Sequence, residues 1–270
     1  MSYKYRLGFI GAGNMAWAIA CGVVEKGLYD GSELIGSDIA AERRGLFSDE
    51  LKAAAVDDNR RVIEEAQTVI LAVKPQQARA VLKPLAGLVG SGQLIVSIMA
   101  GVSTGTIEEI LGANVTVVRV MPNLALSVGA GMTAICRGAR ASDEDVGLAE
   151  KLFRACGQTV LVDEEQMDAV TAVSGSGPAY FFYFVEAMIK AAKEAGLSAE
   201  QAELLAKQSC LGAGQVLLAR REEPAELRRE VTSKGGTTEA ALEVMDEAKL
   251  GEIIRRAVLA GAKRSAELGK

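Results

Sequence analysis

Histidine is absent from all 270 residues of the chain. This absence excludes Ser-His-Asp and Cys-His catalysis and zinc sites with histidine ligands. We also expect no metal centre. Any proton transfer must come from lysine, carboxylate, tyrosine or hydroxyl groups, or from the substrate itself. The composition therefore favours a reaction that requires little proton transfer by the protein.

Clustered cysteines, long apolar runs and an excess of charge are missing as well. The four cysteines are scattered without a Cys-x-x-Cys pair, which is typical of buried thiols in a reducing compartment. No apolar run reaches the length of a membrane span, and we expect no signal peptide and a cytoplasmic location. Lys and Arg total 30 against 35 for Asp and Glu, without a basic block, so neither a membrane nor nucleic acid is an expected partner.

Apolar residues are abundant, and their order along the chain predicts an α/β fold. Hydrophobic residues make up 49% of the sequence, enough for a large core in two modest domains. Strand-like and helix-like segments alternate up to about residue 120, which is typical of a doubly wound parallel sheet with helices on both faces. The expected strands are Leu7–Ile10, Leu34–Ser37, Thr68–Val73, Leu94–Ile98 and Val115–Val120, and the expected helices are Asn14–Lys26, Ala40–Glu50, Asn59–Ala66, Gln76–Leu88 and Thr104–Leu111.

The character of the sequence changes near residue 163. Gly131–Cys136 and Thr159–Val162 flank a helix near Asp143–Ala155 and should extend the sheet, which gives a dinucleotide-binding Rossmann-type domain at 1–162. Residues 163–270 should form an all-helical dimerisation and substrate-binding domain, with helices expected at Glu164–Val173, Pro178–Ala195, Ala199–Ala219 and Thr238–Ala266, the last with a break near Gly251. Several of these helices are apolar around much of their circumference, so we predict that this domain pairs with a second copy as a homodimer, which a larger homo-oligomer could contain.

A glycine-rich segment between the first strand and the first helix predicts dinucleotide binding. Gly11 permits a tight turn, Gly13 leaves room for a pyrophosphate near the backbone, and Ala16 lets the helix pack closely on the strand. The alternative is a strand, turn and helix that bind no ligand.

The end of the second expected strand bears on the choice of cofactor. Asp38 at this position is typical of a contact with the adenosine ribose, which favours NAD over NADP. Arg43 and Arg44 on the next helix could still neutralise a 2′-phosphate, and Asp38 could simply cap that helix. The sequence therefore leaves NADP and NAD both open.

Three further strand ends offer candidate contacts to the nicotinamide. Pro75 ends the third expected strand and places Lys74 near the ring. The alternative is that Lys74 is simply a solvent-exposed lysine after a strand. Small residues around Ala100 after the fourth strand would let a flat ring approach the backbone. Asn123 after the fifth could hold a carboxamide or cap a turn.

Two turns rich in glycine and hydroxyl groups lie in the helical part. Residues 173–180 place Pro178 at the start of a helix, and residues 232–238 place Thr237 or Thr238 at the cap of another. Each turn offers N–H groups and hydroxyls to a small carboxylate. Ordinary capping explains either turn alone, but the presence of both beside a dinucleotide domain favours a substrate site.

With these motifs in order, the chain resembles the pyrroline-5-carboxylate reductase family over nearly its whole length. The resemblance runs through Gly8–Met15, Ala72–Pro75, Met121–Asn123, Asp168–Tyr180 and Ser233–Thr238. It implies reduction of 1-pyrroline-5-carboxylate to L-proline by hydride transfer from NADPH or NADH, the last step of proline biosynthesis. It also implies an active site between the nicotinamide and the helical domain of a partner subunit.

The resemblance also implies roles for individual residues. The residues implied to line the cofactor are Gly11, Ala12, Gly13, Asn14, Met15, Ser37, Asp38, Asn59, Val73, Lys74 and Ala100, with Ser176, Gly177 and Pro178 on the nicotinamide side. Ser233, Gly236 and Thr237 would hold the substrate carboxylate, with Glu164 and Thr171 at the edge of the pocket. The Thr238 hydroxyl would bond the ring nitrogen, as the catalytic group.

The sequence departs from the family pattern at three places, and two alternative functions have to be weighed against the resemblance. Leu124-Ala125 replace a common Thr-Pro, Lys234 replaces the proline of the Ser-Pro-Gly-Gly turn, and Asp38 stands where a neutral hydroxyl residue is common. A β-hydroxyacid dehydrogenase would need a lysine base at the start of the long helix after Pro178, where the sequence has none. A non-catalytic dinucleotide sensor would leave the 233–238 turn without a role.

Overall fold

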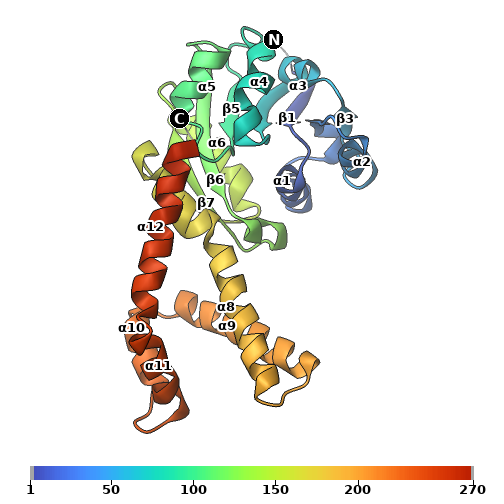
Figure 1. Cartoon of the computed structure of the whole chain (residues 1–270). Helices are drawn as coiled ribbons and strands as arrows, with labels where there is room; N and C mark the ends of the chain where they lie inside the picture. The colour runs from blue at the N-terminus through green and yellow to red at the C-terminus, as the bar shows by residue number, and fades with distance from the viewer. Residues whose placement is uncertain (1–2, 269–270) are drawn as a thin grey trace. The chain divides into compact units, whose positions relative to one another are not determined.

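An eight-stranded sheet runs through the N-terminal part of the computed structural model, which describes residues 3–268 (Figure 1). The strand order is β3-β2-β1-β4-β5-β6-β7-β8, and neighbours are parallel except for the antiparallel pair β6 and β7. The strands are β1 (Tyr5–Ile10), β2 (Leu34–Ser37), β3 (Ala54–Val56), β4 (Ala66–Leu71), β5 (Leu94–Ser97), β6 (Thr116–Pro122), β7 (Gly131–Arg137) and β8 (Gly157–Leu161). The crossover between β1 and β4 creates the switch point at which such sheets bind ligands.

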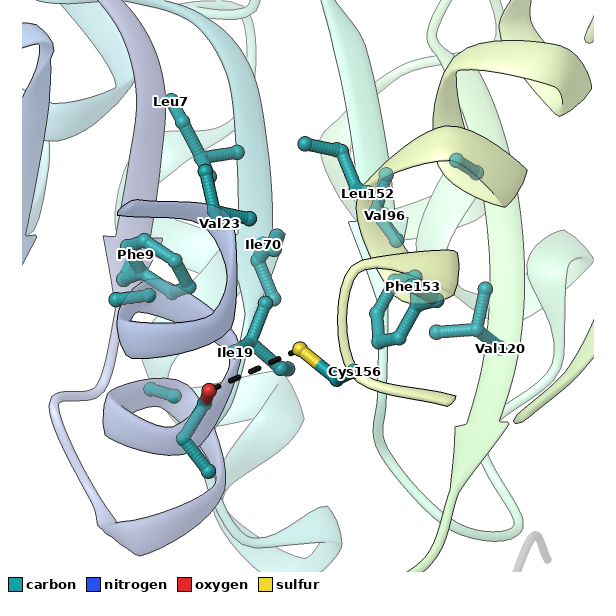
Figure 2. Close-up of a cluster of buried hydrophobic side chains, with 14 of the residues drawn as sticks. Leu7, Phe9, Ile19, Val23, Ile70, Val96, Val120, Leu152, Phe153 and Cys156 are labelled. Atoms are coloured by element: carbon teal, nitrogen blue, oxygen red, sulfur yellow. Dashed lines mark hydrogen bonds between the residues drawn. The ribbon is translucent and has the colours of Figure 1, made fainter. Parts of the chain in front are cut away.

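Helices cover both faces of this sheet because its inner strands are apolar on both sides. On one face Leu7 and Phe9 pack with α1 (Asn14–Glu25) and α6 (Asp143–Arg154). Figure 2 shows this cluster, in which the Cys156 thiol donates to the Ala18 carbonyl. On the other face Tyr5 and Ile10 pack with α3 (Asn59–Glu65), α4 (Ala78–Leu82) and α5 (Thr104–Leu111). Helix α2 (Ala41–Asp49) lies between β2 and β3 in the chain.

The described chain divides into two compact units, each considered by itself below. The first comprises the residues up to Ser176 and those from Ala260, and the second comprises Gly177–Leu259. Within the first, the Ser265 hydroxyl donates to Asp168 Oδ1 at 2.6 Å, and this bond holds the C-terminal segment to α7 (Met167–Val170). The expected domain boundary between residues 162 and 163 stays a prediction.

The second unit consists of helices with little buried surface. Only Gly177, Ala202 and Ala206 are buried among its described residues, whereas Phe181 and Phe182 are 62% and 60% exposed. Its helices are α8 (Gly177–Glu194), α9 (Ala199–Ala219), α10 (Pro224–Glu230), α11 (Thr237–Glu247) and the part of α12 (Leu250–Leu268) up to Leu259. None of the described helices is long and apolar enough to cross a membrane.

The α/β fold predicted from the sequence is confirmed, and each expected strand lies within two residues of an observed one. Two short elements were not predicted, and one predicted helix is wrong. The short strand β3 was not expected, and neither was α10, which Pro224 begins. The helix expected at 76–88 is instead α4 between two 3-10 turns, because Pro84 cannot continue an α-helix.

One correction and one confirmed prediction concern the C-terminal helices. The segment expected as one helix at 164–173 begins as a 3-10 turn, passes through α7 and ends in a π-helical turn, Thr171–Gly175. The last long helical segment breaks at residues 248–249, between α11 and α12, so the predicted break near Gly251 is confirmed; Lys249 has a φ of 54°. The left-handed backbone of Lys249 ends α11 in the way that a helix C-terminus requires.

Candidate active site

The predicted cofactor residues of the first unit follow strands that end at one edge of the sheet. Because β1, β2, β4, β5 and β6 are parallel, their carboxyl ends lie along the same edge. Backbone bonds tie neighbouring ends together: Gly11 N donates to Ser37 O, and Ala72 N donates to Ile10 O, both at 2.8 Å. Gly11, Ser37 and the residues around Ala72 are therefore neighbours.

The glycine-rich segment forms a cradle at the start of α1. Gly11 has a φ of 92°, and a Cβ there would lie 2.7 Å from the Ala72 carbonyl oxygen, so this position requires glycine. A Cβ on Gly13 would meet no described atom within 4 Å. Gly13 is the N-cap of α1, and no side chain of the described residues caps its first turn. Asn14 and Met15 therefore lie in a turn whose N–H groups can receive a phosphate.

The end of β2 is bound to this cradle by side chains. Asp38 Oδ2 accepts from Ala12 N at 2.9 Å, so its carboxylate is fixed against the glycine-rich turn. The Ser37 hydroxyl donates to Asn59 Oδ1 at 2.7 Å, which places Asn59 at the same end. Asp38 is not the N-cap residue of α2, which is Ala40, but its Oδ1 accepts from Ala40 N at 2.9 Å. The sheet thus brings Ala12, Ser37, Asp38 and Asn59 together.

The ends of β4 and β5 supply the next candidates. Val73 lies beside the cradle, since a Cβ on Gly11 would be 3.3 Å from its Cγ1. Lys74 is exposed in the turn that Pro75 continues. Ala100 follows β5, whose end is tied to β4 by the bond from Ile98 N to Leu71 O at 3.2 Å.

The end of β6 is joined to the π-helical turn. Asn123 Oδ1 accepts from Met132 N at 3.2 Å, and its Nδ2 donates to Ser174 Oγ at 3.4 Å. A Cβ on Gly175 would lie 2.5 Å from Met121 Cε, so the turn packs tightly against β6. The Thr171 hydroxyl donates to Met167 O at 2.8 Å, and Ser176 N donates to Thr171 O. π-helical turns often occur at functional sites.

Glu164 is held by three hydrogen bonds within the first unit. Its Oε1 accepts from Thr104 N at 2.8 Å and from Arg119 Nη1 at 3.1 Å, and its Oε2 accepts from the Thr104 hydroxyl at 2.7 Å. Arg119 and Thr104 are both buried, and Thr104 begins α5, where a carboxylate is favourable. Sequence reasoning missed this pair, although Arg119 is the only cation in the apolar run of residues 115–120.

In the second unit, the predicted substrate residues form the N-terminus of α11. Gly236 is the N-cap, with no side-chain cap in the described structure, so the expectation of Thr237 or Thr238 at that position is wrong. Gly235 has a φ of 71°, and its N–H donates to Glu239 Oε2 at 2.6 Å. The turn thus leaves the first-turn N–H groups of α11, with the hydroxyls of Ser233, Thr237 and Thr238, available to an anion. Gly177 and Pro178 belong to this unit as well and begin α8.

The residues of the first unit fit a bound dinucleotide. Its open cradle at Gly13 and the free first turn of α1 suit a pyrophosphate, and the Asp38 carboxylate suits a ribose diol. Among the described residues, no three Cys, Asp or Glu side chains gather as a metal site would require. Fold and site together define a dinucleotide-binding protein of the Rossmann class.

Comparisons with known proteins identify the family. Family models described as "NADP oxidoreductase coenzyme F420-dependent" and "Pyrroline-5-carboxylate reductase dimerisation" match residues 6–101 and 164–268. The pyrroline-5-carboxylate reductase of Pseudomonas aeruginosa is 41% identical over 98% of this chain and 97% of its own length. The chain belongs to the pyrroline-5-carboxylate reductase family.

Solved structures agree with this membership over the whole chain. The pyrroline-5-carboxylate reductase of Coxiella burnetii has a TM-score of 0.90 at 37% identity and covers 99% of each chain. The pyrroline carboxylate reductase of Plasmodium falciparum, solved with NADP bound, has a TM-score of 0.90 at 27% identity and covers 100% of each chain. The predicted family, fold class and enzyme class, an NAD(P)-dependent oxidoreductase, are confirmed. The roles assigned to single residues stay predictions.

Proposed function

We propose that this protein reduces 1-pyrroline-5-carboxylate to L-proline with NADPH or NADH as the hydride donor. The observation that carries the proposal is the 41% identity to a pyrroline-5-carboxylate reductase over nearly the whole of both chains. The cradle at Gly11 and Gly13 and the uncapped start of α11 support it, because the reaction needs a dinucleotide and a carboxylate-bearing imine.

In this proposal the first unit holds and orients the cofactor. The first-turn N–H groups of α1 bind the pyrophosphate, and Asp38 with Ser37 and Asn59 forms the ribose end. Val73, Lys74, Pro75, Ala100 and Asn123 line the sheet edge beyond them, and Ser176 begins the nicotinamide side. When bound, the reduced nicotinamide supplies a hydride, and the protein supplies position.

The turn at residues 233–238 is proposed to hold the substrate. The N–H groups at the start of α11 and the hydroxyls of Ser233 and Thr237 bind its carboxylate, while the Thr238 hydroxyl bonds the ring nitrogen. Hydride adds to the carbon of the C=N bond, and the nitrogen, protonated as the iminium ion, becomes the amine of proline. This chemistry matches a chain without histidine, because the substrate brings its own proton.

The test is the oxidation of reduced nicotinamide in the presence of pyrroline-5-carboxylate, with proline measured as the product. Thr238→Ala should lower kcat by about 10-fold, the effect of losing one hydrogen bond of about 1.4 kcal/mol to the ring nitrogen, and leave dinucleotide affinity unchanged. Ser198→Ala is the matched control, since Ser198 caps α9 in the same unit and lies in no proposed site. An inactive wild-type protein would refute the function, and a fully active Thr238→Ala would refute that residue's role.

We also propose that the working form is a homodimer, which larger assemblies could contain, and that it works in the cytoplasm. The exposed apolar side chains of α8 and α9 border a groove of about 580 Å³, lined among others by Phe181, Phe182, Ile189 and Leu211. A unit with so few buried residues does not have a core of its own, so a second copy that covers this groove would complete it. The four free cysteines fit a reducing compartment.

A further inference from the structure

We propose that Glu239 is a positioning residue, whose carboxylate holds the turn of residues 233–236 in the shape that receives the substrate carboxylate. Glu239 lies one residue beyond the 233–238 motif, and its effect on substrate binding rests on the proposed function. The side chain is half-buried in the first turn of α11, and its Oε2 accepts from Gly235 N at 2.6 Å. This bond ties the start of the helix back to the turn that precedes it.

The backbone of this turn has the pattern of a type II β-turn. Gly236 N donates to Ser233 O at 3.0 Å, which closes the turn from its first residue to its fourth. Gly235, the third residue, has a φ of 71°, whereas Lys234 before it does not have a positive φ. A positive φ at the third position alone is typical of type II, and glycine adopts it without strain. The turn therefore requires glycine at position 235.

The second position of the turn gives it little rigidity of its own. Proline is common at this position because its ring fixes φ near about −65°, and Lys234 has no such ring. A hydrogen bond to a charged group is stronger than one between neutral groups. The bond from Gly235 N to the Glu239 carboxylate thus supplies the constraint that the side chain of Lys234 does not.

The closed turn places the Ser233 hydroxyl at the start of α11. A Cβ on Gly236 would lie 2.5 Å from Ser233 Oγ, so this oxygen lies directly against the N-cap residue. The proposed carboxylate site contains this hydroxyl and the first-turn N–H groups of α11, which no described side chain caps. An open turn would move the hydroxyl away from those N–H groups, and the substrate carboxylate would lose a donor.

The charge of Glu239 acts in the opposite direction to its hydrogen bond. Two carboxylates at one helix N-terminus repel each other, so a role through charge alone predicts that removal of Glu239 improves substrate binding. A role through the turn predicts that removal weakens it. Substitutions that separate the hydrogen bond from the charge therefore decide between the two.

Steady-state kinetics of the full-length protein gives the first measurement. Glu239→Ala should raise KM for pyrroline-5-carboxylate about 5-fold and change kcat less than about 2-fold, because one charge-assisted hydrogen bond that shapes the binding site is lost. KM for the dinucleotide should stay unchanged. Glu239→Gln keeps an oxygen for the Gly235 N–H, so its KM for the imine should stay within about 2-fold of the wild-type value. General damage to the fold would lower kcat instead.

A rescue variant and two controls make the test specific. Lys234→Pro, added to Glu239→Ala, should return KM to within about 2-fold of the wild-type value, because the ring constrains the same turn. No described residue accepts from the Lys234 N–H that proline would remove. Lys234→Ala in the same background removes the cation without adding a ring and should not restore KM. Glu243→Ala removes an exposed carboxylate one turn further along α11 and should match the wild type.

Amide hydrogen exchange of Gly236 reports the state of the turn without turnover. Exchange, resolved to single residues by fragmentation mass spectrometry, should be about 5-fold faster in Glu239→Ala and near the wild-type rate once Lys234→Pro is added. An unchanged or lower KM in Glu239→Ala would overturn the inference, as would unchanged exchange or a failed rescue. A wild-type protein that does not reduce the imine, with exchange rates as expected, would refute the proposed function and leave the role of Glu239 in the turn standing.

Discussion

Glu164 and Arg119 show how a single side-chain pair can connect distant parts of the first unit. The Arg119 side chain is 7% exposed and that of Glu164 is 31% exposed, and the Glu164 carboxylate also receives both donors of Thr104. The pair joins β6, the start of α5 and the segment that leads to the π-helical turn. Glu164 is therefore a structural residue whatever its contact with substrate.

Removal of this carboxylate should destabilise the protein. We expect Glu164→Gln to lower the free energy of unfolding by about 3 kcal/mol, because a buried guanidinium would lose its counter-charge. Urea denaturation at fixed protein concentration measures the loss. Glu109→Gln is the control: its pair with Arg79 is 3.9 Å long and exposed, so it should cost less than about 1 kcal/mol. If Glu164→Gln were as stable as the control and changed only KM, Glu164 would be a substrate contact alone.

Two buried thiols should be inert at neutral pH. Burial raises the pKa of the Cys156 thiol from 9.0 to about 11, and burial together with the nearby Glu164 carboxylate does the same for Cys136. At pH 8 the native protein should therefore react with iodoacetamide at these positions about 100-fold more slowly than the urea-unfolded chain. Peptide mass spectrometry of the labelled protein gives the rates, and equal rates in the two states would contradict the assignment.

The same pKa shifts predict alkaline destabilisation. Below pH 9 these thiols are protonated in both states, so their contribution to stability is complete. Between pH 9 and about 11 the unfolded chain releases these protons and the native protein keeps them, so stability falls as the pH rises. Melting temperatures measured across this interval should decrease, and Cys156→Ala should reduce the slope.

At the scale of an element, the two glycines of the cradle before α1 serve different purposes, one in folding and one in the proposed binding of the cofactor. Gly11 is needed for the fold, because a side chain there meets the Ala72 carbonyl at a φ of 92°. Gly13 has an ordinary φ of −70° and open space where its Cβ would lie, so the fold alone does not require it. What requires it, in the proposed function, is the pyrophosphate.

Paired substitutions test this separation. Gly11→Ala should lower the melting temperature by several degrees, through backbone strain of about 1–3 kcal/mol. Gly13→Ala should change the melting temperature little and weaken NADH binding by about 10-fold or more, since its methyl group occupies the space of the ligand. Calorimetric titration and thermal melting of both variants give the four values. Unchanged NADH affinity in Gly13→Ala would place the pyrophosphate elsewhere.

At the scale of the molecule, the exposed apolar groove between α8 and α9 is the feature that bears on the oligomeric state. Phe182→Asp should convert the proposed dimer to monomers and lower the melting temperature, because an unpaired charge would be buried in the interface. The wild-type melting temperature should rise with protein concentration. Val128→Asp is the control, since Val128 is 78% exposed in the first unit. Sedimentation that shows a wild-type monomer would rule out the homodimer.

Much of the fold could be predicted from the sequence because it depends on near neighbours. The alternation of apolar strands with helical segments located every strand of the sheet except β3, whose three half-buried residues give too short a signal. The helix predicted at 76–88 was drawn too long, because Pro84 lacks the N–H that an α-helix needs and a 3-10 turn, Lys83–Leu85, forms there instead. The start of α11 was misplaced by one residue, because threonine and glycine are both acceptable N-caps.

The candidate site also contains both local features, which could be predicted from the sequence, and contacts between distant residues, which could not. The glycine-rich cradle and the uncapped turn before α11 are local, so their residues could be named from the sequence. The bond from Ala12 to Asp38 and the pair of Arg119 and Glu164 join residues 26 and 45 positions apart. No local pattern specifies which partner such a side chain will meet.

By itself, the sequence determined the order of the elements, the dinucleotide cradle and the absence of imidazole chemistry, because each follows from residue type and spacing over a few turns of chain. The tertiary structure decided the antiparallel joining of β7 to β6, the bonding of Asp38 to the glycine-rich turn, and the burial of Arg119. These depend on which distant segments pack together, and packing is fixed only when the whole sheet has formed.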